Sequence, residues 1–345
     1  MKNKKVIGWL LSATIVFVIQ SVAQVPYNNW NFQIRGTNSQ LTDSLAMLGI
    51  RSDATSGYDN QYDIPRPPRS PSGTYLEVYF PHSGGNYPPI LGTEYATDYQ
   101  GPNDPTWNMS VAASSSGQLT LSWDSTYVNS IEPRVQLFLL DLSNSSMTNM
   151  RTNGSYTFNY TTVRNFQIIG AIKVNLEYLM EGFWNGTTQV QDTVTGYLAS
   201  STSPFGFVDS AKVFLTTTGA GILTFSNAQA GSYYLVIRHR NHLEVWTPSS
   251  MALTRTTTSY SSYDFTTGAG QAYGAGALKL VGSVYVSWGG DVNQDGVIDF
   301  LDRNLTWNNR SQTGYLSTDC NGDNMSDASD YSIVLNNRLK VRQHP

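Results

Sequence analysis

Two acidic segments decide the fold at the end of this chain: DVNQDGVIDFLD, residues 291–302, and DCNGDNMSDASD, residues 319–330. In both copies, positions 1, 3, 5, 9 and 12 carry a carboxylate or amide side chain. Position 6, where such a loop must turn sharply, holds Gly296 in the first copy and Asn324 in the second. Asn is the residue type that best replaces Gly at positive φ. The repeat therefore predicts two copies of one tightly turned loop.

The oxygen pattern matches an EF-hand-type loop, which wraps a hard cation with oxygens at positions 1, 3, 5, 7, 9 and 12, the seventh being a backbone carbonyl. The predicted ligands of the first loop are Asp291, Asn293, Asp295, the Val297 carbonyl, Asp299 and Asp302. Those of the second loop are Asp319, Asn321, Asp323, the Met325 carbonyl, Asp327 and Asp330. One such segment could be an ordinary Asx-rich turn, but two in register favour a pair of Ca²⁺ sites.

The repeat continues beyond the loops. The triplet Asn-Asn-Arg at 308–310 recurs at 336–338, and the apolar residues before it recur in the same register. We therefore expect each loop to lead into a short helix.

A doubled loop with Asp at position 12, no helix before it and one after it resembles the type I dockerin module of secreted bacterial proteins. The resemblance covers Gly290 to about Leu339. It implies two bound Ca²⁺ ions and helices that dock onto a cohesin domain, with loop positions 10 and 11 reading the partner.

This chain departs from the dockerin pattern at the recognition positions. They hold Phe300 and Leu301 in one copy and Ala328 and Ser329 in the other, where the family usually has small hydroxyl or aliphatic residues. Residues 308–309 are Asn-Asn where the family has a basic pair. Calcium binding therefore carries over better than cohesin binding. Phe300 and Leu301 could anchor a partner, but we expect them to pack the small core of the module.

The start of the chain is typical of a secretory signal peptide, predicted here for residues 1–23. Three lysines precede an apolar stretch over 6–19, and small residues follow at 21–23. The stretch is shorter than the roughly 20 residues that a membrane span needs. We expect an exported protein, extracellular or at the cell surface, without a membrane span.

Charge and cysteine content narrow the function further. Only 13% of residues are charged, against about 25% in a typical globular protein. Without the three leader lysines, the 21 basic residues fall to 18 against 25 acidic ones, a net charge of −7 that argues against nucleic acid as a partner. Eight of the acidic residues lie in the two loops, so the segment should be loose without metal. Cys320 is the only cysteine, which excludes an intramolecular disulfide and favours a buried or idle thiol.

Between leader and loops, the pattern is β throughout and predicts two sandwiches, over 24–169 and 170–288, followed by the calcium module over 289–345. Apolar residues alternate at 76–80, 119–123 and 156–160, with Gly, Asn and Ser runs between them. Residues 233–238 alternate in the same way. The stretch IPRPPRSPS, 64–72, should be an extended connector inside the first domain. The predicted fold class is mainly β, with two Ig-like or prealbumin-like sandwiches and a small α module.

Two further resemblances concern these sandwiches. LGIRSDATSGYDNQYDIPRPP at 48–68, with the later LTLSW and SYTF strands, resembles an N-terminal module of secreted and cell-surface bacterial proteins. GILTFSNAQAGSYYLVIRHR at 221–240 is similar to prealbumin-like or carboxypeptidase-regulatory-type sandwiches, a resemblance that implies a spacer or an accessory module. Asp53, Asp59 and Asp63 could hold a third Ca²⁺, but Asp in such turns usually caps its own backbone.

The search for catalytic groups favours a protein that is not an enzyme. His239, His242 and Glu244 could form a cluster, yet a zinc site needs three converging ligands. In a regular strand, residue 239 would face away from 242 and 244, so we expect cross-strand packing and hydrogen bonding instead. The chain has no HExxH, GxSxG or phosphate-cradling glycine motif.

Two classes of function remain. In the first, the protein is a non-catalytic extracellular building block, such as a filament or surface-layer subunit, whose calcium loops lock a contact between domains or subunits. Its partner would be another copy or another extracellular protein. In the second, it is a dockerin-bearing component that binds or degrades polysaccharide and docks to a cohesin; with 21 tyrosines, a sugar-stacking platform is conceivable. The low charge, the spacer-like sandwiches and the altered recognition positions favour the first class.

Overall fold

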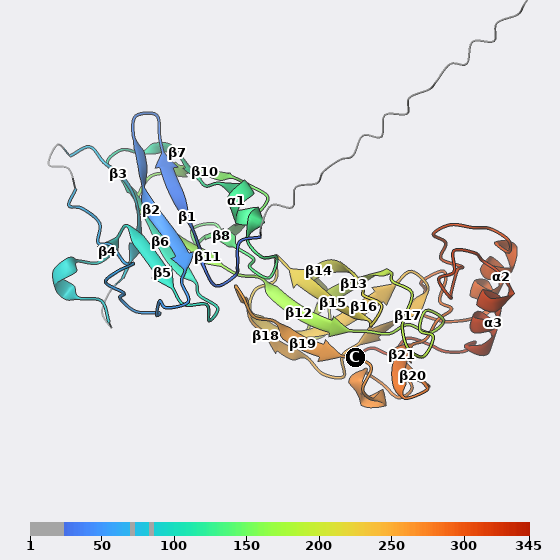
Figure 1. Cartoon of the computed structure of the whole chain (residues 1–345). Helices are drawn as coiled ribbons and strands as arrows, with labels where there is room; N and C mark the ends of the chain where they lie inside the picture. Colours follow the sequence, from blue (N-terminus) through green and yellow to red (C-terminus); the bar gives the residue numbers. More distant parts are fainter. Residues whose placement is uncertain (1–23, 70–72, 83–85) are drawn as a thin grey trace, which may run out of the picture.

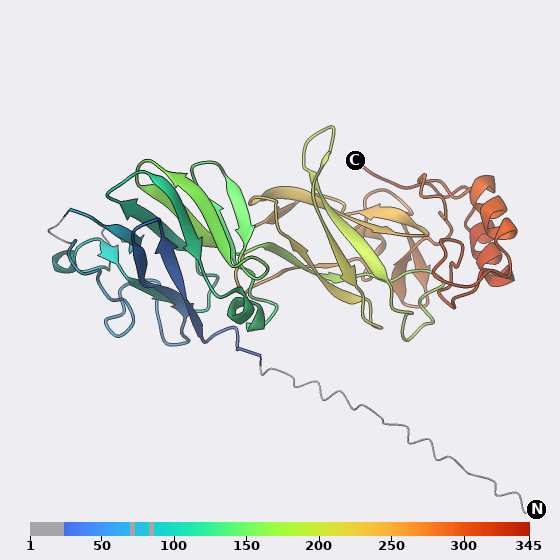
Figure 2. The ribbon, with the colours of Figure 1, turned by 90° about the horizontal axis from the view of Figure 1, so that it is seen from above.

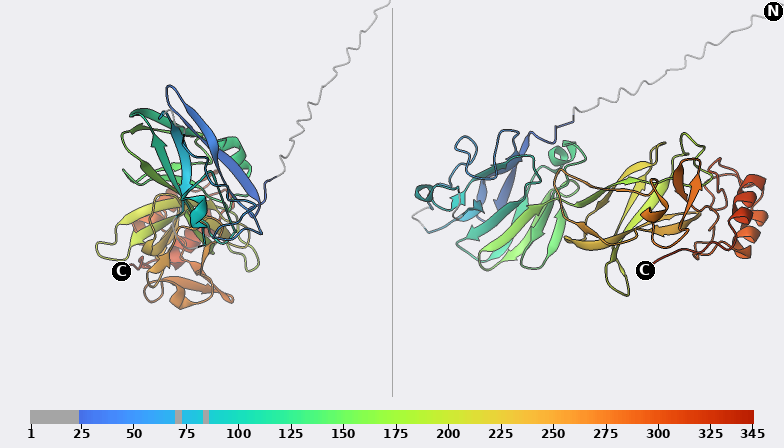
Figure 3. Two further views of the ribbon diagram at one scale, coloured as in Figure 1. Left: turned by 90° about the vertical axis from the view of Figure 1, so that its left-hand side faces the viewer. Right: turned by 90° about the horizontal axis from the view of Figure 1, so that it is seen from below.

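The computed structural model describes residues 24–69, 73–82 and 86–345, so the predicted signal peptide lies outside the described residues. Two β-sandwiches and a small helical unit follow one another along an elongated molecule (Figures 1 and 2). The view from below shows the same order (Figure 3, right). The predicted fold class, mainly β with small helices at the C-terminal end, is confirmed. None of the helices in the described residues is long and apolar enough to cross a membrane.

The first sandwich packs two sheets face to face. One has the order β10-β7-β1-β2-β5, and its strands are β1 (Trp30–Thr37), β2 (Thr42–Ile50), β5 (Thr97–Gln100), β7 (Gly117–Ser122) and β10 (Ser155–Tyr160). The other has the order β4-β3-β6-β11-β8-β9, and its strands are β3 (Leu76–Pro81), β4 (Glu94–Tyr95), β6 (Trp107–Ala113), β8 (Phe138–Asp141), β9 (Ser146–Asn149) and β11 (Arg164–Ile169). Helix η1 (Pro89–Leu91) precedes β4, and α1 (Ser125–Ser130) follows β7.

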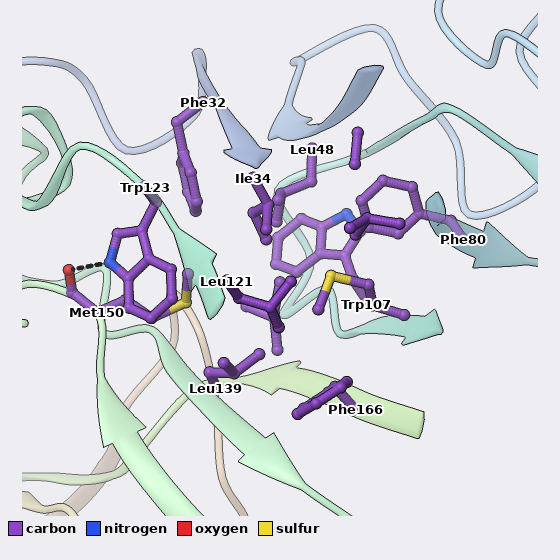
Figure 4. Packing of buried hydrophobic residues seen from close by; sticks show 14 of the residues in the cluster. Phe32, Ile34, Leu48, Phe80, Trp107, Leu121, Trp123, Leu139, Met150 and Phe166 are labelled. Carbon is purple, nitrogen blue, oxygen red and sulfur yellow. Dashed lines mark hydrogen bonds between the residues drawn. The ribbon is translucent and has the colours of Figure 1, made fainter. Parts of the chain in front are cut away.

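The core of this sandwich follows the alternation read from the sequence. Leu76, Val78 and Phe80 of β3 are buried between the sheets, as are Leu119 and Leu121 of β7. Figure 4 shows Leu121 and Phe80 with the large aromatic side chains that fill the centre. The indole N–H of Trp123 donates to the carbonyl of Met150 at 3.0 Å, which satisfies its polar group in an apolar setting (Figure 4).

The proline-rich connector runs between β2 and β3 as expected, but it also contributes a buried ion cluster. Nη2 of Arg66 lies 2.8 Å from a carboxylate oxygen of Asp43, and Nε of Arg69 lies 2.7 Å from Glu77. The Arg66 and Asp43 side chains are almost fully buried. Sequence reasoning missed this cluster because its partners lie far apart in the chain. Residues 70–72 of the connector lie outside the described residues.

The second sandwich begins at residue 172. One sheet has the order β15-β12-β19, from β12 (Ile172–Glu177), β15 (Ala220–Phe225) and the parallel β19 (Ser261–Asp264). The other has the order β14-β13-β16-β17, from β13 (Thr193–Ser200), β14 (Phe207–Phe214), β16 (Gly231–His239) and β17 (His242–Trp246), with β18 (Met251–Leu253) also paired to β16. Helix η2 (Ala269–Gln271) and the hairpin β20 (Leu278–Val281) and β21 (Val284–Ser287) follow.

The strand β16 has the two faces that the sequence predicted. Leu235 and Ile237 belong to the sandwich core, whereas Val236 packs on the other face with Trp246 and Ala199. The two sandwiches are joined through Lys173, whose Nζ donates to the carbonyls of Arg134 at 2.5 Å and Thr257 at 2.9 Å. Burial lowers the pKa of Lys173 to about 8.

The last unit consists of two acidic loops and the helices α2 (Phe300–Asn308) and α3 (Ala328–Asn336), which lie side by side (Figures 1 and 2). The prediction that each loop leads into a helix is confirmed. Its small core contains Val292, Ile298, Cys320 and Val334, together with Leu243 of β17. The thiol of Cys320 is buried, and burial raises its pKa well above the usual value. The module therefore completes its core with a residue of the second sandwich.

The expectation that Phe300 and Leu301 pack this core is wrong. Their side chains are 60% and 45% exposed. The helix turns Asp302 and Thr306 inward instead, four residues apart on one face. Positions 10 and 11 consequently lie on the outside.

Candidate metal centre

Both loops end in the same helix-capping geometry. Asp299 at position 9 is the N-cap of α2, and its Oδ1 accepts from the N–H of Leu301 at 2.7 Å. Asp327 caps α3 in the same way, accepting from Ser329 at 2.6 Å. In each case the position-12 carboxylate accepts from the N-cap N–H, which completes a capping box. Positions 9 and 12 are thus oriented by the start of the helix.

The position-12 carboxylates also close the loops. Oδ1 of Asp302 accepts from the N–H groups of Val292 at 2.9 Å and Asn293 at 3.2 Å. Oδ1 of Asp330 accepts from those of Cys320 at 2.6 Å and Asn321 at 3.1 Å. Both carboxylates are fully buried, and burial raises the pKa of each, although these hydrogen bonds oppose the shift.

Positions 3 and 5 repeat one arrangement. The side-chain oxygens of Asn293 and Asn321 each accept from the position-5 N–H at 3.0 Å. The carboxylates of Asp295 and Asp323 each accept from the position-7 N–H at 2.9 Å. At position 6, φ is 91° for Gly296 and 71° for Asn324, which confirms the predicted left-handed turn in both copies.

At position 7, each loop pairs with another segment of the chain. Val297 forms a β-bridge with Val341, and Met325 forms one with Thr313. The segment after α2 supports the second loop, since Ser311 N–H donates to the Ser326 carbonyl at 2.8 Å. The C-terminal tail supports the first loop: Leu339 and Arg342 N–H groups donate to the Ile298 and Gly296 carbonyls, both at 2.8 Å. Sequence reasoning did not find this pairing, because no motif marks it.

The loops differ at position 1. Asp291 is buried, and its Oδ2 accepts from the Gly296 N–H at 3.1 Å, but its Oδ1 is buried without a hydrogen-bond partner. Burial, together with the nearby Asp302 and Asp295 carboxylates, raises the pKa of Asp291 to about 7. A buried carboxylate oxygen without a donor is costly. A cation in the loop would remove that cost.

Asp319, at position 1 of the second loop, is fully satisfied by the protein. Its Oδ1 accepts from the N–H groups of Gly322 at 2.7 Å and Asp323 at 3.2 Å. Its Oδ2 accepts from the Asn324 N–H at 3.1 Å and lies 3.6 Å from Nη2 of Arg240.

The donor sets of both loops fit Ca²⁺ in kind, because carboxylate, amide and carbonyl oxygens are its ligands in proteins. The unpartnered oxygen of Asp291 makes the fit clearest in the first loop. Nowhere in residues 24–69, 73–82 and 86–345 do three or more His, Cys, Asp or Glu side chains stand close enough to hold a metal ion by themselves. The backbone N–H groups of each loop hold its carboxylates, and the proposed ligand sets also use Asn side chains and carbonyls.

The turn between β16 and β17 seats the second loop on the sandwich. Nδ2 of Asn241 donates to the Asp319 carbonyl at 2.6 Å, and Nη1 of Arg240 donates to the same carbonyl at 3.2 Å and to that of Leu316. Asp192 of the sandwich accepts from Arg240 Nε at 3.1 Å and from the Tyr315 hydroxyl at 2.7 Å. This junction was not visible from the sequence, since its residues are about 80 to 120 positions apart.

A second buried contact involves Asn337, at the end of α3. Nδ2 of Asn337 donates to Glu181 at 2.5 Å and to the Gly289 carbonyl at 2.7 Å. Lys279 of β20 forms an ion pair with the same carboxylate. The module is therefore attached to the second sandwich at two separate points.

The face assignment of the histidines is corrected by the structure. A register shift after Ile237 places His239 opposite His242, with a 2.8 Å hydrogen bond between their Nδ1 atoms. Nε2 of His239 lies 3.0 Å from Asp192, while Glu244 pairs instead with Arg238. Burial lowers the pKa of both imidazoles. The favoured interpretation, cross-strand packing and hydrogen bonding, agrees with this arrangement.

The candidate third calcium loop also uses its carboxylates internally. Asp59 accepts from the Thr55 N–H at 2.6 Å, and Asp63 accepts from the Asp59 and Tyr99 N–H groups at 2.7 and 3.0 Å. Asp53 accepts from the Tyr62 hydroxyl at 2.8 Å. These contacts are the backbone caps and local bonds that the turn-forming role of Asp predicts.

No family model matches the chain, and no curated protein sequence matches it. Two solved structures are similar over part of its length, both mutants of a type II cohesin-X-dockerin complex from Acetivibrio cellulolyticus. The C-terminal interface mutant is 17% identical with a TM-score of 0.30, over 49% of this chain and 97% of that chain. The N-terminal interface mutant is 17% identical with a TM-score of 0.28, over 50% and 97%. Superpositions this loose establish neither a common fold nor a common partner.

Proposed function

We propose that this chain is an exported, non-catalytic assembly protein, in which two sandwiches form a rod and the C-terminal loops bind two Ca²⁺ ions. The buried, unpartnered oxygen of Asp291 is the observation that carries the calcium proposal. The ions would lock the junction between module and second sandwich, because Asp319 belongs to both the second loop and that junction.

Calcium would contribute enough free energy to matter for this junction. Extracellular sites of this class bind with dissociation constants of roughly 10⁻⁴ to 10⁻³ M. Free ion at about ten times the dissociation constant stabilises the folded state by about 1.4 kcal/mol per site. A module of this size is marginal by itself and completes its core with Leu243. Two ions would then decide whether it stays docked.

Calorimetric titration and limited proteolysis test this proposal together. We expect two Ca²⁺ ions per chain, and EDTA should speed cleavage within 289–345 while the sandwiches resist. Asp53→Asn is the matched control, since it removes a loop carboxylate outside the proposed sites and should leave the titration unchanged. Absence of binding heat, or digestion that is identical with and without chelator, would contradict calcium binding.

Self-association is supported by an uncovered edge strand. Within the part of the chain that the structure describes, β14 pairs only with β13, and it exposes Phe207, Val208 and Phe214. Such an edge can accept a strand from another copy. We expect electron microscopy in millimolar Ca²⁺ to show ordered assemblies that Phe214→Lys abolishes. Dispersed monomers of the unaltered chain over a range of concentrations would contradict a filament or surface layer.

A second candidate function is docking to a cohesin as part of a polysaccharide-binding or polysaccharide-degrading complex. The exposure of Phe300 and Leu301, with Leu305 and Trp307 beside them on α2, favours it. Ala328 and Ser329 of α3 are exposed as well. We expect a cohesin domain to bind the unaltered chain in Ca²⁺ but not the Phe300→Ala variant. If the cohesin retained the unaltered chain and the variant equally, or retained neither, this candidate would be contradicted. A glycan array would test polysaccharide binding directly.

A further inference from the structure

Arg240 places a fixed positive charge beside the second loop. It belongs to the turn between β16 and β17, and its side chain is largely buried. Its guanidinium is held by Asp192 and lies 4.3 Å over the ring of Tyr315. From there it reaches both the carbonyl and the carboxylate of Asp319. Asp192 can hold this charge, because burial, which raises the pKa of its carboxyl, is outweighed by side-chain hydrogen bonds from His239 and Tyr315, which lower it.

The first loop has no equivalent cation. Among the described residues, no Lys, Arg or His forms an ion pair with Asp291, Asp295, Asp299 or Asp302. Arg342 lies against Gly296 with its Cγ, Cδ and Nε atoms, but among the described residues it forms no ion pair with a carboxylate of the first loop, unlike Arg240 in the second. The two position-1 carboxylates, identical in sequence, therefore stand in different electrostatic surroundings.

We propose that Arg240 acts as a built-in cation of the second loop, so that the first loop is the tighter Ca²⁺ site and the second binds Ca²⁺ against the charge of Arg240. This inference rests on the calcium binding proposed above. A guanidinium near Asp319 repels an incoming Ca²⁺ and competes for the same carboxylate. The affinity of such loops follows their net ligand charge, which Arg240 reduces in the second loop only.

Asn241 makes it possible to test the charge of Arg240 separately from the position of the second loop. Its amide holds the Asp319 carbonyl without adding charge, so the loop stays seated on the sandwich when the Arg240 charge is removed. Arg240 is thus a positioning residue, and its charge can be removed while Asn241 still holds the second loop on the sandwich. Without metal, the second loop should keep more of its order than the first loop, which should open around Asp291.

A two-site calcium titration of the full chain tests this inference. We expect the two sites to differ by about tenfold or more, which corresponds to about 1.4 kcal/mol. Asp291→Asn and Asp319→Asn assign each site, and the tighter one should disappear with Asp291→Asn. Arg240→Gln should narrow the gap to within about threefold by tightening the second site. Arg240→Lys, which keeps the charge, should preserve the gap even where hydrogen bonds are lost.

Arg303→Gln is the matched control, because it removes one exposed positive charge of the same module away from both position-1 carboxylates. It should leave both affinities unchanged. Two sites of equal affinity in the unaltered chain, a tighter second site, or an unchanged gap in a folded Arg240→Gln variant would each overturn the inference alone. A chain that binds no Ca²⁺ would overturn the proposed function as well, so the two failures are distinguishable. Circular dichroism of each variant reports whether the sandwiches remain folded.

Discussion

The two acidic loops share one local plan but not one environment. Positions 3, 5, 9 and 12 make the same hydrogen bonds in both copies, often at equal distances. At position 1, Asp291 keeps a buried oxygen without a partner, whereas Asp319 is satisfied by three N–H groups and approached by Arg240. Repeated residues thus reproduce the geometry of a loop, while its electrostatics depend on what the rest of the chain places beside it.

The comparison extends to the segments that support each loop. The second loop is backed by the residues that follow α2 and is seated on the sandwich by Asn241. The first loop is backed by the C-terminal tail after α3. Each support can be removed separately, so the difference between the loops is open to experiment.

The largest effect is expected from Asp291→Asn. In Ca²⁺ it should weaken the first site by more than about 100-fold, because the position-1 carboxylate is lost. In EDTA it should stabilise the module by about 1–3 kcal/mol, because it removes a buried negative charge that lies near the Asp302 and Asp295 carboxylates. Urea unfolding followed by tryptophan fluorescence measures both. Asp319→Asn should give no gain in EDTA, and equal gains in the two variants would erase the contrast.

Ending the chain at Arg338 should affect only the first loop. The deletion removes the Leu339, Lys340 and Arg342 backbone hydrogen bonds to that loop. Each is worth about 1 kcal/mol, so we expect a loss of about tenfold or more in the affinity of the first site. A chain ending at Arg342 keeps all three bonds and serves as the control. A comparable loss at the second site would show that the supports are not separate.

Acid should weaken the contact between the second loop and the second sandwich. Burial lowers the pKa of His239 and His242, so each takes up a proton less readily in the fold than in the unfolded chain, where imidazoles titrate near pH 6.5. Stability is therefore present above that pH and falls as pH decreases, by at most about 1.4 kcal/mol per imidazole between pH 7.5 and 5.5. The groups facing the pair are the Asp192 carboxylate, the Arg240 guanidinium and the backbone carbonyl of Glu181.

Denaturant unfolding at the two pH values measures this loss. His239→Gln should flatten the pH dependence, whereas His344→Gln, at an exposed histidine, should not. The first sandwich should respond in the opposite direction. Burial raises the pKa of Asp63 to about 6. The first sandwich should therefore lose stability as the pH rises through about 6 and gain it on acidification. Parallel responses of the two sandwiches would contradict these assignments.

The smallest effect is expected from Asn324→Gly, which makes position 6 of the second loop like that of the first. Asn324 adopts a φ of 71°, a conformation that Gly accepts at less cost. The greater chain entropy of Gly offsets part of that gain, so we expect the module to change by at most about 0.5 kcal/mol. The ratio of the two calcium affinities should stay as it is, because Arg240 is untouched. If the two calcium affinities became equal, the turn at position 6, rather than Arg240, would be the cause of their difference.

Much of the architecture was predictable because it depends on local patterns. The alternation at 76–80 and 119–123 predicted strands, and the doubled loop predicted both helices and the positive φ at Asn324. The prediction that Phe300 and Leu301 are buried was wrong, since a helix can direct polar Asp302 and Thr306 inward. The parity argument for His239 failed because one register shift exchanges the faces of a strand.

The sequence by itself determined the β pattern, the two loops and the kinds of oxygen they carry, because period-2 alternation and twelve-residue spacing are properties of neighbouring residues. Only the tertiary structure decided that Arg240 lies beside Asp319 and that the tail lies beside Gly296. It also decided that Asp291 has a buried oxygen without a donor. Such contacts join residues that are far apart in the chain, and packing alone sets their burial and charge.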